Sequence, residues 1–583
     1  MTAISHEVQY PLGWIASHGQ AVISQVNALS SALDLYSSKM AEGVNFRSSM
    51  LKKDPLLQFV ATNLHLQVLS VCDPMARKGT HYDFTTTGAP VAHKGGYKAG
   101  GLTSLEESLG LMKETVLRYR QQYKSLADAS ELKRTAKVEN VSEMEEVMNK
   151  LRKALVEYEM LSFDVGMRRV CVGSQVVSIA AASFCLKLEM MARGTLNLET
   201  SGCSTAEELA RRWVKHGFLI GFEGLLSILG KEQGMVEDTV IALDMLSRYT
   251  LQVVPASPDK PPVSALVGMN GEFEMEVGID GNRIQCHLSE SSMAMLPTVL
   301  WTDGGQGLSI FPVFFTQGID IQQSMSNASG PTNKKASFQL HINADNLSKL
   351  NDYCHQVQPM REDGSSVAGR FTIPYFAPKP RPLSSAETIR EHPGQADLLG
   401  LFDHLAEEAT VRPQPLHPRR QTTQDSQETH PSLIELESAV RHSKLNEKNT
   451  AILLEAQLAV RRLGGGRVTF CKSGKDRTAM SVTLEEALIL VQNHVRKDSA
   501  SSQGHEGVSG VLGSSWRHAE ANGALRVANV LRAHGARLIV AEKNVGRPKY
   551  SFNALQRQFI PELYQPPLET IQDVITSALN RDS

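Results

Sequence analysis

A cysteine and an arginine separated by five residues are the part of this sequence that points most directly to chemistry. They belong to the stretch 471–478, which reads CKSGKDRT. If this stretch curls into a cradle, its backbone amides can bind the oxygens of a phosphate, and Gly474 allows a turn that a side chain would obstruct. Arg477 can then hold two equatorial oxygens with a planar pair of hydrogen bonds. The spacing therefore predicts phosphoryl transfer.

Cys471 is the predicted nucleophile of this reaction. Arg477 and the N-terminus of a following helix would favour its thiolate. In-line attack would produce a phosphocysteine, which water hydrolyses in a second step, so the prediction includes no metal and no other cofactor. Thr478 can donate its hydroxyl to the sulfur and ease departure of the thiolate.

Asp476 is the nearest candidate for the general acid that protonates the leaving alkoxide. The myotubularin and Sac-type lipid phosphatases have an aspartate immediately before the arginine, whereas tyrosine phosphatases usually take the acid from a separate loop. The alternative is a structural aspartate that accepts backbone hydrogen bonds. In that case another Asp or Glu supplies the proton.

Two lysines, Lys472 and Lys475, are expected around the mouth of the cradle. They suit a substrate with more than one phosphate, because they meet charge that the transferring phosphate does not use. A phosphotyrosine pocket would gain little from them, although either lysine can also be read as a solvated loop residue. With Ser473, Gly474 and Thr478 they form the predicted substrate-binding set.

The flanking elements must place this loop where a strand meets a helix. Residues 446–463 are predicted to be helical, the glycines at 464–466 stop that helix, 467–470 is a short strand, and 478–494 is a helix again. This order aims several backbone N–H groups and the positive end of a helix at a bound anion.

The predicted fold is α/β, with a Cys-x5-Arg domain like that of the protein tyrosine phosphatases at 256–583 and a mainly α-helical region at 1–255. In the first region, the apolar stripes at 105–123 and 144–158 follow capping boxes at Thr103 and Ser142, and predict two helices that pack together. The segment 359–431 is predicted to be a disordered linker and 498–515 a flexible loop.

Composition limits the partners and the compartment. In the 583 residues, 60 Lys and Arg nearly balance 62 Asp and Glu, so no nucleic-acid partner is predicted. The seven cysteines are scattered without C-x-x-C spacing, which favours a reducing compartment. The start lacks a secretory pattern, and the longest near-apolar run, 176–186, is shorter than the ~20 residues that span a bilayer. We therefore expect a cytoplasmic protein with peripheral membrane contact.

The loop and two further segments resemble the inositol polyphosphate 4-phosphatases. Residues 471–485 match the signature of that family, with Gly474 in place of its usual alanine. Residues 543–553 with 564–567 are similar to its C-terminal block, and 318–323 are similar to a segment upstream of the linker. Members commonly begin with a lipid-binding C2 domain, which is not evident at the start of this sequence.

The resemblance implies hydrolysis of the 4-phosphate of phosphatidylinositol 3,4-bisphosphate, with soluble inositol phosphates as secondary substrates. It carries over Cys471 as nucleophile, Arg477 as phosphate binder, Asp476 as acid, and Lys472 and Lys475 as inositol-phosphate contacts. Three basic residues of the C-terminal block have no assigned role: Lys543, Arg547 and Lys549.

Two alternatives remain open at this stage. The same chemistry could act on another inositol phosphate position or on a phosphoprotein. The chain could also be a catalytically silent phosphoinositide-binding scaffold whose helical half binds partners. The intact Cys471, Asp476 and Arg477 argue against the scaffold.

Overall fold

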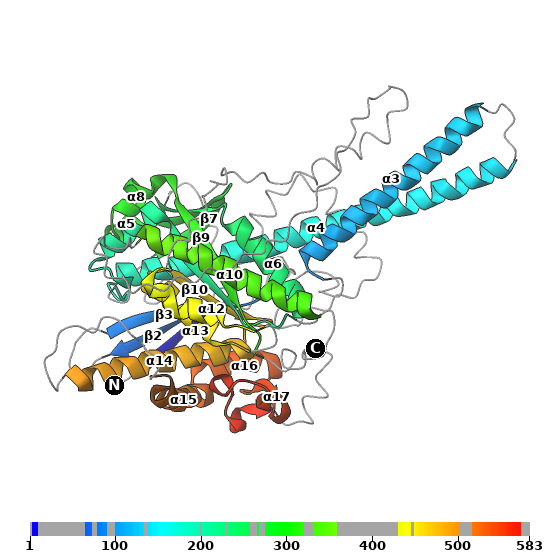
Figure 1. Ribbon diagram of the computed structural model, residues 1–583. Coiled ribbons are helices and arrows are strands. Elements are labelled where there is room, and N and C mark those ends of the chain that lie inside the picture. Colours follow the sequence, from blue (N-terminus) through cyan, green and yellow to red (C-terminus); the bar gives the residue numbers. More distant parts are fainter. Residues whose placement is uncertain are drawn as a thin grey trace. The chain divides into compact units, whose positions relative to one another are not determined.

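The structure of the protein is a computed structural model, and a mixed β-sheet forms its centre (Figure 1). The structure describes residues 3–9, 64–72, 79–89, 100–132, 138–198, 201–228, 231–256, 265–267, 274–319, 332–357, 429–444, 448–500 and 516–572, all within one structural unit. Nearly all of the predicted linker, 359–431, and most of the predicted loop, 498–515, lie outside these residues.

The described strands follow an order in the sheet that differs from their order in the chain. Across the sheet they are β1 (Ala3–Gln9), β2 (His65–Cys72), β3 (Gly79–Gly88), β10 (Gly466–Cys471), β4 (Phe218–Gly224), β9 (Leu308–Thr316), β5 (Thr250–Pro255), β8 (Arg283–Leu288), β7 (Glu274–Asp280) and β6 (Ala265–Val267). The four central strands, β3, β10, β4 and β9, are mutually parallel. Their carboxyl ends therefore meet at one edge.

Strands from both sides of the predicted boundary at 255/256 share this sheet, because β10 lies between β3 and β4. The mainly helical reading of 1–255 omitted the strands β1 to β5. The strand β4, FLIGFEG, is buried along its whole length. Such a strand, covered on both faces, lacks the alternation of apolar and polar residues that reveals a half-exposed strand.

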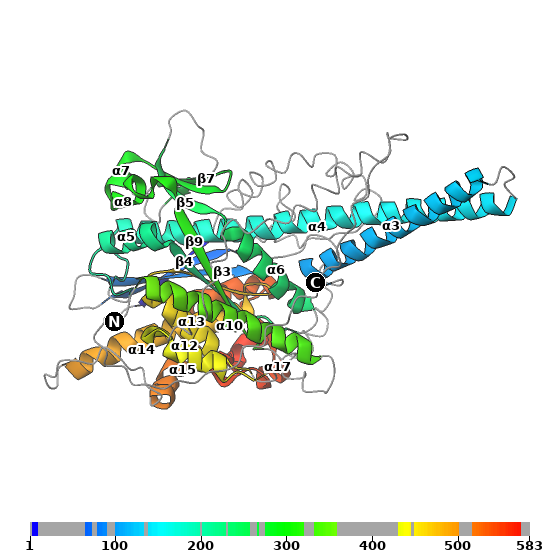
Figure 2. The same cartoon turned by 45° about the horizontal axis from the view of Figure 1, so that its top comes forward.

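Helices cover the two faces of the central strands (Figures 1 and 2). On one face, α4 (Val138–Ala192) packs against Val468 and Phe470 of β10. Its window Gln175–Ala192 is long and apolar enough to cross a membrane, but 89% of it is buried inside the structure. It is thus a core helix of this unit. The opposite face carries α10 (Thr332–Val357), α12 (Ile434–Arg441), α13 (Ala451–Arg462), α14 (Asp476–Ala500), α15 (Trp516–His534) and α16 (Ala536–Val545).

The two predicted helices of the N-terminal half are confirmed as α3 (Leu102–Leu132) and α4, which lie side by side. Both begin before the predicted caps, so Thr103 and Ser142 are helical residues. The N-terminus of α3 is instead capped by α6 (Lys231–Leu246), where Asp238 Oδ1 accepts a hydrogen bond from the Leu102 amide at 2.6 Å. Asp238 Oδ2 also accepts from Arg168 Nε of α4 at 2.8 Å. One buried carboxylate therefore joins three helices.

Candidate active site

The predicted strand–loop–helix order is found around Cys471. Strand β10 ends at Cys471 and α14 begins at Asp476. The neighbouring strands hold this end in place, because the Ala89 amide donates to the Cys471 carbonyl and the Leu225 amide to the Phe470 carbonyl, each at 2.8 Å. Cys471 is 1% exposed. The loop therefore lies at the carboxyl edge of the parallel strands, facing the N-terminus of α14.

Gly474 meets a steric requirement at this loop. Its φ is +70°, a left-handed conformation that L side chains rarely adopt. A Cβ at this position would lie 2.5 Å from the carbonyl carbon and oxygen of Thr87 at the end of β3. The alanine usual in the resembling family would collide with this backbone unless the strand or loop moved.

Arg477 forms an ion pair with Glu232, near the start of α6. Nη1 donates to Oε2 at 2.7 Å and Nη2 donates to Oε1 at 2.5 Å. Both side chains are nearly buried, and Glu232 Oε2 also accepts from the Ser227 amide at 2.8 Å. Burial raises the pKa of Glu232, but the charge and hydrogen bonds of Arg477 outweigh this, so its pKa lies below the usual value. Sequence reasoning missed Glu232, since an acid in the first turn of a helix is common.

The two lysines of the loop differ in their surroundings. Lys472 is exposed, as expected at the mouth of a cradle, whereas Lys475 is only 1% exposed. Ser473 between them is half-buried. Of the two lysines, Lys472 is therefore the one whose side chain is open to solvent.

Asp476 is tied to the C-terminal block. Its Oδ1 accepts a hydrogen bond at 2.9 Å from the amide of Ser551, in β11 (Tyr550–Asn553). This is the contact expected of a structural aspartate, while its role as general acid stays a prediction. The contact also places the matching block 543–553 beside the loop. Arg547 of that block is half-buried, and the side chain of Lys543 lies outside the described residues.

Thr478 is fully buried, and its hydroxyl has no hydrogen-bond partner within the described part of the chain. The predicted hydrogen bond from Thr478 to the Cys471 sulfur is thus not formed in this structure.

The segment 318–323, which also resembles the family, lies beside the loop, because Ile319 packs in the apolar cluster that contains Cys471. Its predicted companions, Gln322 and Gln323, lie outside the described residues.

A second arginine, Arg537 of α16, connects the loop to the end of β3. Its Nη1 donates to Thr86 Oγ1 at 3.0 Å and its Nη2 to the Gly474 carbonyl at 3.4 Å. The side chain is 1% exposed. Sequence reasoning missed it, because a lone arginine in an amphipathic helix is typical of an exposed face.

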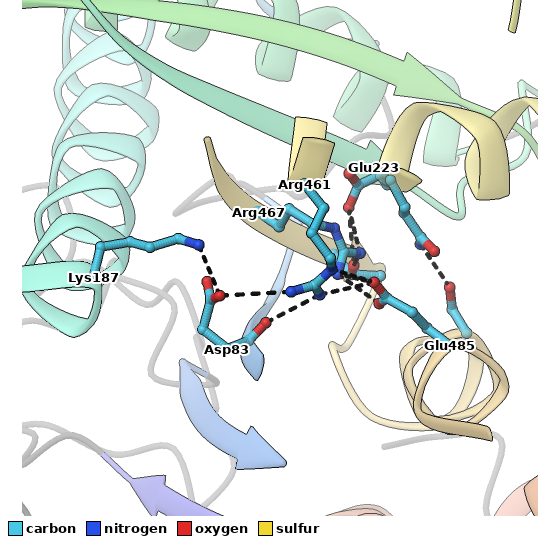
Figure 3. Close-up of polar contacts among 9 residues, drawn as sticks. Asp83, Lys187, Glu223, Arg461, Arg467 and Glu485 are labelled. Atoms are coloured by element: carbon cyan, nitrogen blue, oxygen red, sulfur yellow. Dashed lines mark hydrogen bonds and ion pairs between the residues drawn. The ribbon is translucent and has the colours of Figure 1, made fainter. Parts of the chain in front are cut away.

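A buried network of charges links Arg467 of β10 to side chains of the neighbouring strands and helices, and reaches Lys187 of α4 (Figure 3). Arg467 Nη1 donates to Glu485 at 2.5 Å, and Arg467 Nη2 lies 3.4 Å from Glu223 Oε2. Arg461 bridges Glu485, at 2.8 Å, and Asp83, at 3.6 Å, and Lys187 pairs with Asp83 at 2.9 Å. Three cations thus offset three carboxylates.

Glu223 is a member of this network whose pKa is raised well above its usual value. Burial raises its pKa to about 7, with a further contribution from Glu485 and opposition from Arg467. It also accepts a hydrogen bond from Thr469 Oγ1 at 3.0 Å, across the pair of strands β4 and β10. Because Thr469 is two residues from Cys471, the network fixes the strand that presents the thiol.

The fold and this site define a mixed α/β protein with a buried cysteine at the turn from a central strand into a helix. The chain belongs to the family of the INPP4A C-terminal domain, whose family model matches residues 14–162, 162–364 and 399–564. The family resemblance inferred from the loop is thereby confirmed.

Named relatives fall into two groups. The type II inositol 3,4-bisphosphate 4-phosphatase of Pongo abelii is 27% identical over 434 residues, covering 73% of this chain and 35% of the relative. The human inositol polyphosphate 4-phosphatase type II is 28% identical over 353 residues, covering 60% and 28%. The human phosphatidylinositol 3,4,5-trisphosphate-dependent Rac exchanger 2 protein is 24% identical over 358 residues, covering 60% and 20%. The chain thus spans about a third or less of the length of these relatives.

Proposed function

We propose that this chain is a phosphoinositide phosphatase of the Cys-x5-Arg type, with a domain like that of the protein tyrosine phosphatases and with the loop 471–478 as its active site. One observation carries the proposal: Cys471 ends a central parallel strand, and Arg477 stands in the first turn of the helix that follows. Backbone amides and the helix N-terminus in this arrangement favour an anion above the sulfur. Relatives named as inositol 4-phosphatases support the same class of reaction.

The proposed reaction has two steps. The Cys471 thiolate attacks phosphorus, so that a sulfur–phosphorus bond forms and the phosphate ester bond breaks, while the leaving oxygen takes a proton from the general acid. Water then attacks the phosphocysteine and gives a proton to the general acid, which is a carboxylate after the first step, so that inorganic phosphate and the thiolate are released. Arg477 would stabilise the equatorial oxygens in both steps. Asp476 is the candidate acid, through the carboxylate oxygen that does not accept from Ser551.

The proposed substrate is phosphatidylinositol 3,4-bisphosphate, cleaved at its 4-phosphate, with soluble 4-phosphorylated inositols as secondary substrates. The position on the ring follows the names of the relatives, and Lys472 at the loop suits a substrate with a second phosphate. A lipid substrate requires peripheral contact with a membrane surface, and we keep a cytoplasmic location as part of the proposal.

A panel of phosphoinositides and a phosphotyrosine peptide tests this function. Purified protein should release phosphate from phosphatidylinositol 3,4-bisphosphate and leave the 3-phosphate lipid. Cys471→Ser should abolish turnover, while Cys354→Ser, at a buried cysteine of α10, should retain it. Preference for the peptide or for another ring position would overturn the assignment of the substrate. Unchanged turnover in Cys471→Ser would refute the assignment of Cys471 as the nucleophile.

The match to a Rac exchanger favours one second candidate, a catalytically silent phosphoinositide-binding scaffold. In that case the wild type would bind phosphoinositide vesicles without releasing phosphate from any member of the panel. Cys471→Ser would then bind the phosphoinositide vesicles as the wild type does, because the thiol would take part in no reaction.

A further inference from the structure

The ion pair between Arg477 and Glu232 connects the loop to a helix that is 245 residues away in sequence. Both terminal nitrogens of the guanidinium take part, and each donates to a different oxygen of the carboxylate. Such a paired contact constrains the plane of the guanidinium as well as its position. Glu232 therefore controls which way Arg477 faces.

The geometry of the guanidinium determines what this contact leaves for a substrate. Arginine carries five N–H groups in one plane. Glu232 takes one from each terminal nitrogen, so the edge formed by Nε and one Nη still has two N–H groups that Glu232 does not engage. A phosphate that approaches along that edge does not have to displace Glu232. We propose that Glu232 is a positioning residue that orients Arg477 toward the equatorial oxygens of the transferring phosphoryl group.

Glu232 is itself held firmly enough for this task. Its Oε2 accepts from the Ser227 amide, in the segment that directly follows β4. The helix that carries it is anchored six residues further on by Asp238, which is fully buried and binds both Arg168 and the Leu102 amide. A carboxylate held at one oxygen by the Ser227 amide, on a helix that is itself anchored, reduces the rotational freedom that Arg477 loses when the transition state forms.

The same ion pair admits a competing explanation with the opposite consequence. If Glu232 occupied the place of a phosphate, it would inhibit the site, and its removal would increase activity. If it positions Arg477, its removal lowers the rate of the chemical step. The direction of the change therefore separates the two explanations.

The effect on catalysis rests on the proposed function, so the test combines turnover with a binding measurement. Glu232→Gln keeps the size of the side chain but loses the charge and one acceptor. We expect kcat on a soluble inositol phosphate to fall by about 100-fold, as for a displaced catalytic group, with little change in KM. The dissociation constant of vanadate, measured by calorimetry, should rise by a similar factor. Glu232→Asp, which retains the charge, should recover part of both.

Two controls isolate positioning from a general structural effect. Glu237→Gln removes a carboxylate of the same helix that accepts from the Gly101 amide, and it should leave kcat and vanadate binding unchanged. In an Arg477→Lys background, Glu232→Gln should cause little further loss, because lysine lacks the paired donors. The melting temperature of each variant shows whether it is folded.

Wild-type or increased turnover in Glu232→Gln would overturn the inference, as would an equal loss in the Arg477→Lys background. Failure of the proposed function looks different. In that case the wild type would release no phosphate from any phosphoinositide. The dissociation constants of vanadate for Glu232→Gln and the wild type would still test whether Glu232 positions Arg477.

Discussion

The backbone of Thr87 lies directly against Gly474, so that a Cβ on the glycine would come within 2.5 Å of the Thr87 carbonyl. Strand β3 thus shapes the loop that carries Cys471, although almost four hundred residues of chain separate them. The first prediction concerns this contact.

Gly474→Ala should destabilise the fold and reduce turnover. Left-handed φ costs a non-glycine residue about 1–2 kcal/mol, and the collision with Thr87 adds to this. Gly194→Ala is the matched control, since φ there is +62° and nothing lies within 4 Å of the added Cβ. Denaturant unfolding should show a larger loss for Gly474→Ala. Equal losses would mean that the loop moves away from β3 without cost.

Asp476→Asn should separate the two roles of this residue. The amide oxygen can still accept from Ser551, so the free energy of unfolding should change little. If Asp476 is the acid, hydrolysis of an inositol phosphate should fall by roughly 10²–10⁴-fold, and that of a nitrophenyl ester far less, because nitrophenolate leaves without a proton. Steady-state assays on both substrates measure this. Equal losses on both would assign Asp476 a purely structural role.

Glu223 should make stability depend on pH. Its pKa rises from 4.5 in the unfolded chain to about 7 in the fold, so the folded state holds a proton that the unfolded state has released between these values. Its contribution to stability is therefore fully present below pH 4.5 and is lost as the pH rises to about 7. The loss is on the order of 3 kcal/mol.

Glu223→Gln tests this dependence, because glutamine cannot titrate yet can accept from Thr469. Unfolding free energies at pH 5 and pH 8 should fall less steeply with pH in the variant than in the wild type. Identical slopes would show that the network keeps Glu223 ionised throughout.

Arg168 and Arg169 are adjacent on α4 but should differ greatly in their effect on stability. Arg168 is 3% exposed and pairs with a fully buried Asp238, whereas Arg169 is 44% exposed and pairs with Glu106 on α3. Arg168→Ala should cost about 3–5 kcal/mol, because it removes the cationic partner of a buried carboxylate. Arg169→Ala should cost less than about 1 kcal/mol. Denaturant unfolding of the two variants provides the comparison, and similar losses would contradict it.

Local patterns in the sequence were enough to locate the candidate loop. Glycines after an apolar stripe end α13, a short apolar run forms β10, and a second stripe forms α14, so the strand–loop–helix order follows from propensities of neighbouring residues. The family likeness of the loop is local for the same reason. The caps of α3 and α4 were misplaced, because the α3 cap comes from Asp238 on another helix.

The sequence by itself determined the cysteine, the arginine, their spacing and the elements on either side of them. Only the tertiary structure decided that Glu232 pairs with Arg477, that Arg537 donates to the Gly474 carbonyl, and that the backbone of Thr87 lies against Gly474. The physical reason is the insertion of β10 between β3 and β4. Periodicity reports which face of an element is buried, but the partners of a buried polar group depend on which distant backbones the sheet order brings together.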